Sequence, residues 1–138
     1  MKIGILTYHR TLNYGACLQA IATRVVLEKM GHEVYYVDYW PKYHRQAYKA
    51  FSFGRFISLG VRSRLYYLLE SIKWYKFRKQ RIANFEYFLG IYIYPYCRPT
   101  TDEFDAIVYG SDQIWRKQEA IKSYNPVYFA QNRFQAHK

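Results

Sequence analysis

Residues 3–19 join a short apolar run directly to a helical pattern, and this junction constrains the fold more than any other feature of the chain. We expect a buried strand over residues 2–8, a polar loop over residues 9–14, and a helix that opens at Gly15. A strand that leads into a helix is the start of an α/β unit. It places backbone N–H groups and the positive end of the helix dipole at the strand's carboxyl end. The junction therefore predicts a site for a negatively charged ligand.

Two further segments extend this unit into a sheet. Apolar residues at helical spacing give residues 15–30 one apolar face, and Gly31 follows as a helix-ending residue. Residues 34–38 and 106–109 are short apolar runs that indicate a second and a third buried strand. A strand, a helix and a strand in this order form a right-handed parallel crossover. The sequence therefore predicts the α/β class, with parallel strands in one sheet and the helix on one face.

A bound cofactor or metal is not expected. Asp38 closes the second strand, where an acid holds a ribose hydroxyl in dinucleotide-binding folds, but the first loop lacks the G-x-G-x-x-G pattern. Asp38 is therefore predicted to end the strand or to bond the loop. Neither the histidines nor Cys17 and Cys97 show metal or redox spacing, and free thiols indicate a reduced, cytoplasmic setting.

The cations of the chain are concentrated in its middle. The formal net charge is +11, and residues 42–98 hold twelve lysines and arginines against two acids, Glu70 and Glu86. Such a basic block suits an anionic partner, which can be phospholipid head groups, nucleic acid or a phosphorylated substrate. The alternative is a solvated helical face that binds nothing.

The same middle region, residues 41–98, is predicted to be a basic, aromatic helical insertion. Residues 43–60 are expected to be irregular, residues 62–80 and 81–89 to be two helical stretches, and residues 92–99 to be a loop. Aromatic residues alternate with lysine and arginine here. They can stack on bases, lie on a membrane surface, or pack against the body of the domain.

A second polar loop follows the strand at residues 106–109. Gly110 ends that strand, and Ser111, Asp112 and Gln113 come directly after it. Ligands of open parallel sheets bind at the carboxyl ends of the strands. We therefore expect this loop and the loop at residues 9–14 to lie at the same sheet edge.

Two motifs together resemble the polysaccharide pyruvyl transferase family. They are Asn13-Tyr-Gly-Ala-Cys-Leu-Gln19 and Gly110-Ser-Asp-Gln-Ile-Trp115, and the later segment Tyr124-Asn-Pro-Val-Tyr-Phe129 is similar as well. The resemblance covers residues 2–38 and 104–130. It implies two Rossmann-like domains facing across a cleft, as in GT-B-like enzymes.

The resemblance also implies a reaction, in which a pyruvyl group passes from phosphoenolpyruvate to a sugar hydroxyl during bacterial surface-polysaccharide synthesis. The acceptor is then a sugar or a lipid-linked saccharide, and the place of action is cytoplasmic or peripheral at the inner membrane. Family members are much longer, so residues 1–138 are expected to be the N-terminal Rossmann-like domain alone. The second domain would be missing, and the chain would be inactive without it.

Candidate site residues follow from this chemistry, which needs cations and N–H donors for the donor and acid–base groups for ketal formation. His9 and Asp112 are predicted to be catalytic. Substrate binding is assigned to the remaining polar and glycine positions of the two loops, namely Arg10, Asn13, Gly15, Gly110, Ser111 and Gln113.

Structural alternatives exist for several of these residues. His9 can bond within its loop, Asn13 can hold the turn before Gly15, and Asp112 can cap the following turn. Trp115 can stack on a sugar ring or belong to the core. The rival function is a non-catalytic module that binds anionic membrane lipid or, less expected, nucleic acid.

Overall fold

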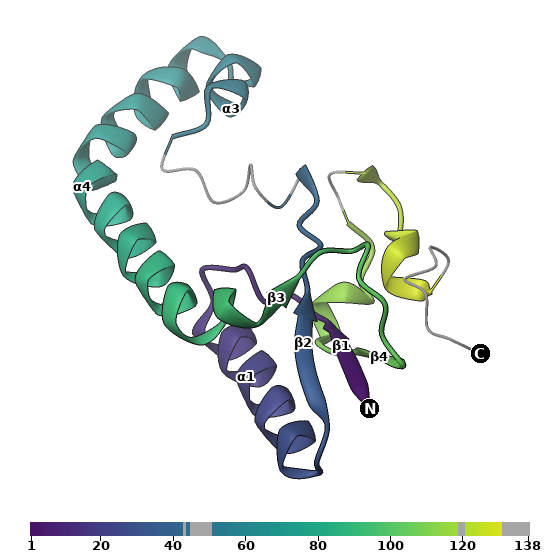
Figure 1. Cartoon of the computed structure of the whole chain (residues 1–138). Coiled ribbons are helices and arrows are strands. Elements are labelled where there is room, and N and C mark those ends of the chain that lie inside the picture. The colour runs from purple at the N-terminus through teal and green to yellow at the C-terminus, as the bar shows by residue number, and fades with distance from the viewer. Residues whose placement is uncertain (43, 45–50, 119–120, 131–138) are drawn as a thin grey trace. The chain divides into compact units, whose positions relative to one another are not determined.

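The computed structural model describes residues 1–42, 44, 51–118 and 121–130 (Figure 1). The chain divides into two compact units. The first contains Met1–Trp40 and Leu89–Lys138, and the second is Pro41–Phe88. Each unit is described by itself.

The first unit is built on a four-stranded parallel sheet. Its strands are β1 (Lys2–Leu6), β2 (Glu33–Val37), β3 (Cys97–Arg98) and β4 (Ala106–Tyr109), in the order β3-β2-β1-β4. β1 pairs in parallel with β2 on one side and with β4 on the other. The predicted α/β class with a parallel, Rossmann-like sheet is confirmed.

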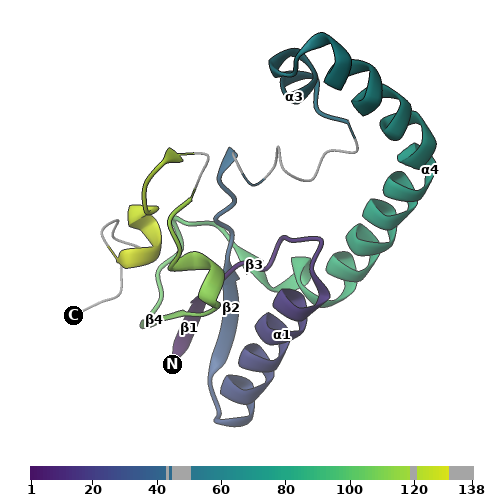
Figure 2. The ribbon, with the colours of Figure 1, turned by 180° about the vertical axis from the view of Figure 1, so that it is seen from behind.

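Helix α1 (Tyr14–Lys29) connects β1 to β2 and packs beside β2, as Figures 1 and 2 show from opposite sides. Asn13 caps its first turn. At its other end Gly31 has φ +85°, and its N–H donates to the carbonyl of Glu28 while His32 donates to that of Leu27. These two hydrogen bonds form a Schellman motif. The motif requires a residue with a left-handed backbone, a conformation that glycine adopts without strain. The predicted helix and its glycine stop are confirmed.

The core lies along β1 and under the segments that follow β4. Leu6, Val37, Phe104, Ile114 and Tyr128 are buried in one cluster. Gly4 is part of the same packing: a Cβ added there would lie 2.7 Å from Ile107 Cδ1 and 3.0 Å from Val37 Cγ2. Glycine at this position lets the neighbouring side chains close over the strand.

The second unit corrects two predictions for the middle region. α4 (Val61–Tyr92) is one continuous helix rather than two stretches, because neither glycine nor proline interrupts residues 61–89. α3 (Phe53–Ser58) is a short helix inside the segment that was expected to be irregular; of that segment, residues 43 and 45–50 lie outside the description. The Ser52 hydroxyl accepts from the N–H of Arg55 and so starts α3.

One further expectation for residues 41–98 is wrong. Residues 92–99 are not all loop, since β3 pairs with β2, and the N–H of Asp38 donates to the carbonyl of Arg98 at 2.8 Å. Tyr66, Phe77 and Tyr87 are exposed side chains of α4. In the part of the chain that the structure describes, no helix is apolar over a sufficient length to cross a membrane.

Candidate functional site

The strand order defines where a ligand site is expected. β2 and β3 lie on one side of β1, and β4 lies on its other side. The order in which strands are added to the sheet therefore reverses at the boundary between β1 and β4. The N–H of Gly110 donates to the carbonyl of Leu6 at 3.1 Å, which places the two following loops together at the carboxyl edge. The prediction that these loops share one sheet edge is confirmed. This position is the switch point at which α/β sheets bind ligands.

His9 lies beneath this edge rather than on it. Its side chain is 1 % exposed and stacks on the ring of Tyr36 at 5.3 Å. Nδ1 donates to the carbonyl of Thr7 at 3.0 Å, which leaves Nε2 to accept from the thiol of Cys97 at 3.9 Å. Burial lowers the pKa of His9 to about 4, so the ring is neutral at pH 7. This placement favours the structural alternative over acid–base chemistry.

Arg10 is paired within the protein. Its Nη2 donates to Asp38 Oδ2 at 3.0 Å, and its guanidinium lies near the rings of Trp40 and Tyr94. The predicted role of Asp38 in bonding the loop is thereby confirmed. Because the carboxylate balances the charge of Arg10, this cation is not set up to attract a substrate anion.

The amides at the start of α1 are also satisfied internally. Asn13 Oδ1 accepts from the N–H of Gly15 at 2.9 Å and from that of Ala16 at 3.5 Å. Asn13 therefore acts as the helix cap that was its structural alternative. A ligand anion at this helix end would have to displace the Asn13 side chain, so the structure does not support an open anion site there.

The second loop has an unusual backbone. Ser111 is buried and has φ +83°, a left-handed conformation that is uncommon for a residue with a side chain. Its hydroxyl accepts from the N–H of Gln113 at 3.3 Å and so holds the turn Asp112–Ile114. Ser111 thus does the capping that was the alternative for Asp112, whose side chain lies outside the description. Gln113 Oε1 accepts from Arg116 at 3.1 Å.

An aromatic cleft follows this loop. Trp115, Tyr124 and Phe129 line a cavity of about 670 Å³ together with Ser123 and Pro126. The rings of Trp115 and Tyr124 lie 5.2 and 5.7 Å from that of Phe129, both edge-on. Trp115 is 44 % exposed, so the core alternative for it is wrong. The sequence reasoning missed Tyr124 and Phe129 as site residues, although the segment that contains them was recognised as part of the resemblance.

The cleft is anchored to the carboxyl edge of the sheet. Asn125 and Tyr39, the latter just past β2, are joined by hydrogen bonds of 3.0 and 3.3 Å. Tyr128 contacts Tyr39 edge-on at 5.5 Å, and Trp115 lies 6.2 Å from Tyr109, the last residue of β4. Residues distant in the sequence therefore form one wall beside the switch point.

The sheet and the cleft together describe a Rossmann-like α/β domain that has an aromatic cleft beside its switch point. Comparisons of the chain with models of protein families, with curated proteins and with solved structures found no match. Among the described residues, no group of three His, Cys, Asp or Glu side chains is arranged to hold a metal ion.

Proposed function

We propose that the chain is the N-terminal part of a polysaccharide pyruvyl transferase-like enzyme and that its aromatic cleft holds the sugar acceptor. The enzyme would transfer a pyruvyl group from phosphoenolpyruvate to a sugar hydroxyl in surface-polysaccharide synthesis. A two-domain GT-B-like architecture belongs to this proposal.

One observation carries the proposal. The two motifs of the resemblance are about a hundred residues apart in the sequence, yet the first begins at Asn13, which caps α1 after the β1 loop, and the second begins at Gly110, directly after β4. β1 and β4 pair with each other, so both motifs begin at the same edge of the sheet. The switch point of a parallel sheet is where α/β enzymes bind substrates. Their convergence there supports a shared role in one site.

The chemistry of the cleft supports a sugar as the ligand. A pyranose ring presents C–H groups on its faces and hydroxyl groups around its edge. The exposed ring of Trp115 offers an apolar face, while the hydroxyls of Ser123 and Tyr124 offer hydrogen bonds at the rim. The cavity volume of about 670 Å³ lies within the usual range for ligand sites, roughly 300–1,000 Å³.

The first loop gives weaker support for binding of the pyruvyl donor, phosphoenolpyruvate. Arg10 is paired with Asp38 and Asn13 caps α1, so neither is free to bind phosphoenolpyruvate without rearrangement. The N–H of Gly110 donates to the carbonyl of Leu6 at the end of β1, and the buried Ser111 follows directly. We therefore place the pyruvyl donor beside the Gly110–Ser111 backbone in this proposal.

Binding of a saccharide is tested by following the indole N–H signals of the chain in two-dimensional NMR spectra. The probes are disaccharides of glucose, galactose and mannose, added with and without phosphoenolpyruvate. We expect at least one disaccharide to shift the Trp115 indole signal, and phosphoenolpyruvate to shift the amides of Gly110 and Ser111. Pyruvate plus inorganic phosphate is the control for nonspecific anion effects.

A matched pair of variants assigns the binding to the cleft. Trp115→Ala should abolish saccharide binding, whereas Trp74→Ala, at a comparably exposed tryptophan of α4, should leave it unchanged. Shifts confined to other regions, or saccharide affinity that survives in Trp115→Ala, would contradict the proposal.

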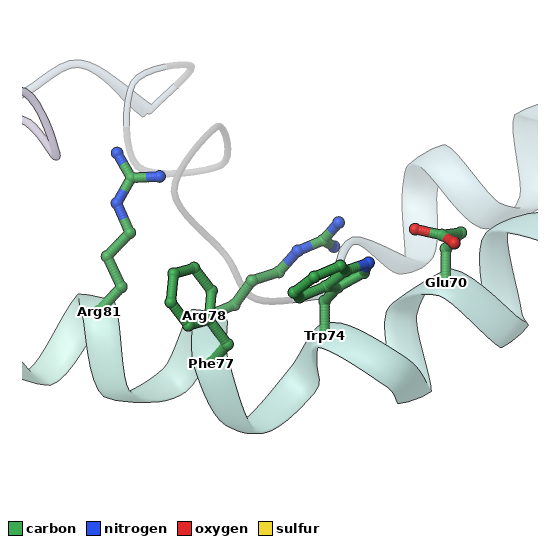
Figure 3. A pocket seen from close by; sticks show the side chains of 5 residues that line it. All are labelled: Glu70, Trp74, Phe77, Arg78 and Arg81. Carbon is green, nitrogen blue, oxygen red and sulfur yellow. The ribbon is translucent and has the colours of Figure 1, made fainter.

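The rival module has one observation in its favour, which is the charge of α4. Lys76 and Lys79 lie on one side of that helix, but Arg78 and Arg81 lie on another, where they line a pocket (Figure 3). The four cations therefore do not form a single stripe. The parallel sheet with its polar loops favours the enzyme.

A further inference from the structure

Helix α4 exposes a continuous row of large apolar side chains. Five residues at spacings of three and four lie within a sector of about 100° around the helix axis: Val61, Leu65, Leu68, Leu69 and Ile72. Val61 is 84 %, Leu65 61 % and Ile72 66 % exposed. We call these five residues the apolar row. A helix face of this width is normally covered, because leaving it in water forfeits hydrophobic stabilisation.

The charges near the apolar row are positive. Lys76 and Lys79 continue the same face toward the end of the helix, and Lys73 lies at its edge; all three are exposed. Of the two acids of α4, Glu70 lies on the side of the helix away from the apolar row, and Glu86 lies on the face of the row but seven residues beyond Lys79. Figure 3 shows the surroundings of Glu70. There it lines a separate pocket of about 250 Å³ with Trp74, Phe77, Arg78 and Arg81.

This combination of charge and apolar surface selects the kind of partner. A second copy of the chain would bring the lysines of one row against the cations of another, which like-charge repulsion disfavours. An anionic lipid surface accepts both features, since apolar side chains enter the acyl boundary and lysines reach the head groups on their long stems. We propose that the apolar row and Lys73, Lys76 and Lys79 bind an anionic lipid bilayer, with α4 lying in the plane of the surface.

Co-sedimentation of the full chain with vesicles tests this proposal. The probes are vesicles of pure phosphatidylcholine and vesicles with about one third phosphatidylserine. We expect binding to the anionic vesicles that weakens as salt rises, because exposed charges are screened over about 8–10 Å at physiological ionic strength. The charge variant K73Q/K76Q/K79Q should bind roughly a hundredfold more weakly, at about fivefold per lysine.

The apolar part of the surface needs its own variant. L65Q/L69Q/I72Q should weaken vesicle binding at least about tenfold, because each removed side chain no longer enters the lipid. These three side chains are exposed, so the variant is expected to fold, and circular dichroism checks that it does.

Two control variants make the same chemical changes elsewhere. K29Q/K42Q/K117Q removes three exposed lysines, and L18Q/V26Q removes exposed apolar side chains of α1. Both should bind anionic vesicles as the unaltered chain does. The proposal is overturned if the unaltered chain does not bind these vesicles or if the controls weaken binding equally. It is also overturned if L65Q/L69Q/I72Q instead abolishes a dimer of the chain, or if single-stranded oligonucleotide binds α4 and vesicles do not.

Discussion

Arg10 donates from Nη2 to Oδ2 of Asp38 at 3.0 Å, and this ion pair ties the loop after β1 to the end of β2. The rings of Trp40 and Tyr94 lie 5.3 and 4.9 Å from the guanidinium carbon. These contacts hold the pair in one position, because a planar guanidinium stacks on aromatic faces while it donates to a carboxylate.

Asp38→Asn should lower the free energy of unfolding by about 1 kcal/mol, since Asp38 is partly exposed and solvent weakens the pair. Arg10→Lys should cost a similar amount, about 1 kcal/mol, because lysine keeps the charge but loses the planar contacts. Urea unfolding of both variants and of the double variant measures the coupling. Strictly additive effects would show that the two side chains do not stabilise each other.

Stability should fall on acidification through His9. Burial holds the pKa of His9 at about 4, below its ordinary value of 6.5, so the unfolded chain binds the proton more readily than the folded one. This contribution is complete above pH 6.5 and is lost as pH falls toward 4. Between pH 7 and pH 5 it amounts to about 2 kcal/mol. Urea titrations measure the free energy of unfolding at both pH values. Its decrease from pH 7 to pH 5 should be smaller by this amount in His9→Asn than in the unaltered chain. Equal decreases in the two proteins would contradict the prediction.

Two glycine substitutions should change stability in opposite directions. Gly4→Ala is expected to destabilise the chain by about 1–3 kcal/mol, because the new methyl group meets Ile107, Phe104 and Val37. Gly90→Ala should stabilise it by about 0.5–1 kcal/mol, because alanine favours helix and the space there is open. Thermal unfolding of both variants compares them directly. Equal effects would mean that the packing around Gly4 relaxes freely.

The two free cysteines should react slowly in the folded chain. Burial raises the pKa of Cys97 to about 11 and also raises that of Cys17, so little thiolate is present at pH 8. The stronger nucleophilicity of a high-pKa thiolate offsets part of this effect, which leaves alkylation of Cys97 about tenfold slower than that of an unfolded thiol. Mass spectrometry after iodoacetamide treatment, with and without urea, measures the difference. Cys97→Ser isolates Cys17, and equal rates in both solvents would contradict the prediction.

The features that the sequence predicted well are those with local causes. The helix α1 is bounded by Asn13, whose side chain bonds the next turn, and by Gly31, which adopts a left-handed backbone. The alternation of strand and helix and the handedness of the crossover follow from chain geometry, so the parallel neighbours of β1 could be expected. The shared edge of the two loops follows from the same rule.

The remaining features depend on contacts between distant residues. β3 is two residues long and is defined by its hydrogen bonds to β2, which no local periodicity of Cys97 and Arg98 reveals. The residue types of the first loop suit ligand contacts, but His9 is buried against Tyr36.

By itself, the sequence determined the α/β order, the ends of α1 and the placing of two polar loops after strands, because backbone geometry and capping act over a few residues. Tertiary structure alone decided that Arg10 is neutralised by Asp38, that Trp115 lines an open cleft, and that the apolar row of α4 is exposed. The physical reason is that pairing, burial and exposure depend on which distant residues arrive nearby. The type of a side chain limits what it can bind. Its neighbours in space determine whether contacts within the protein already satisfy its charge and hydrogen bonds.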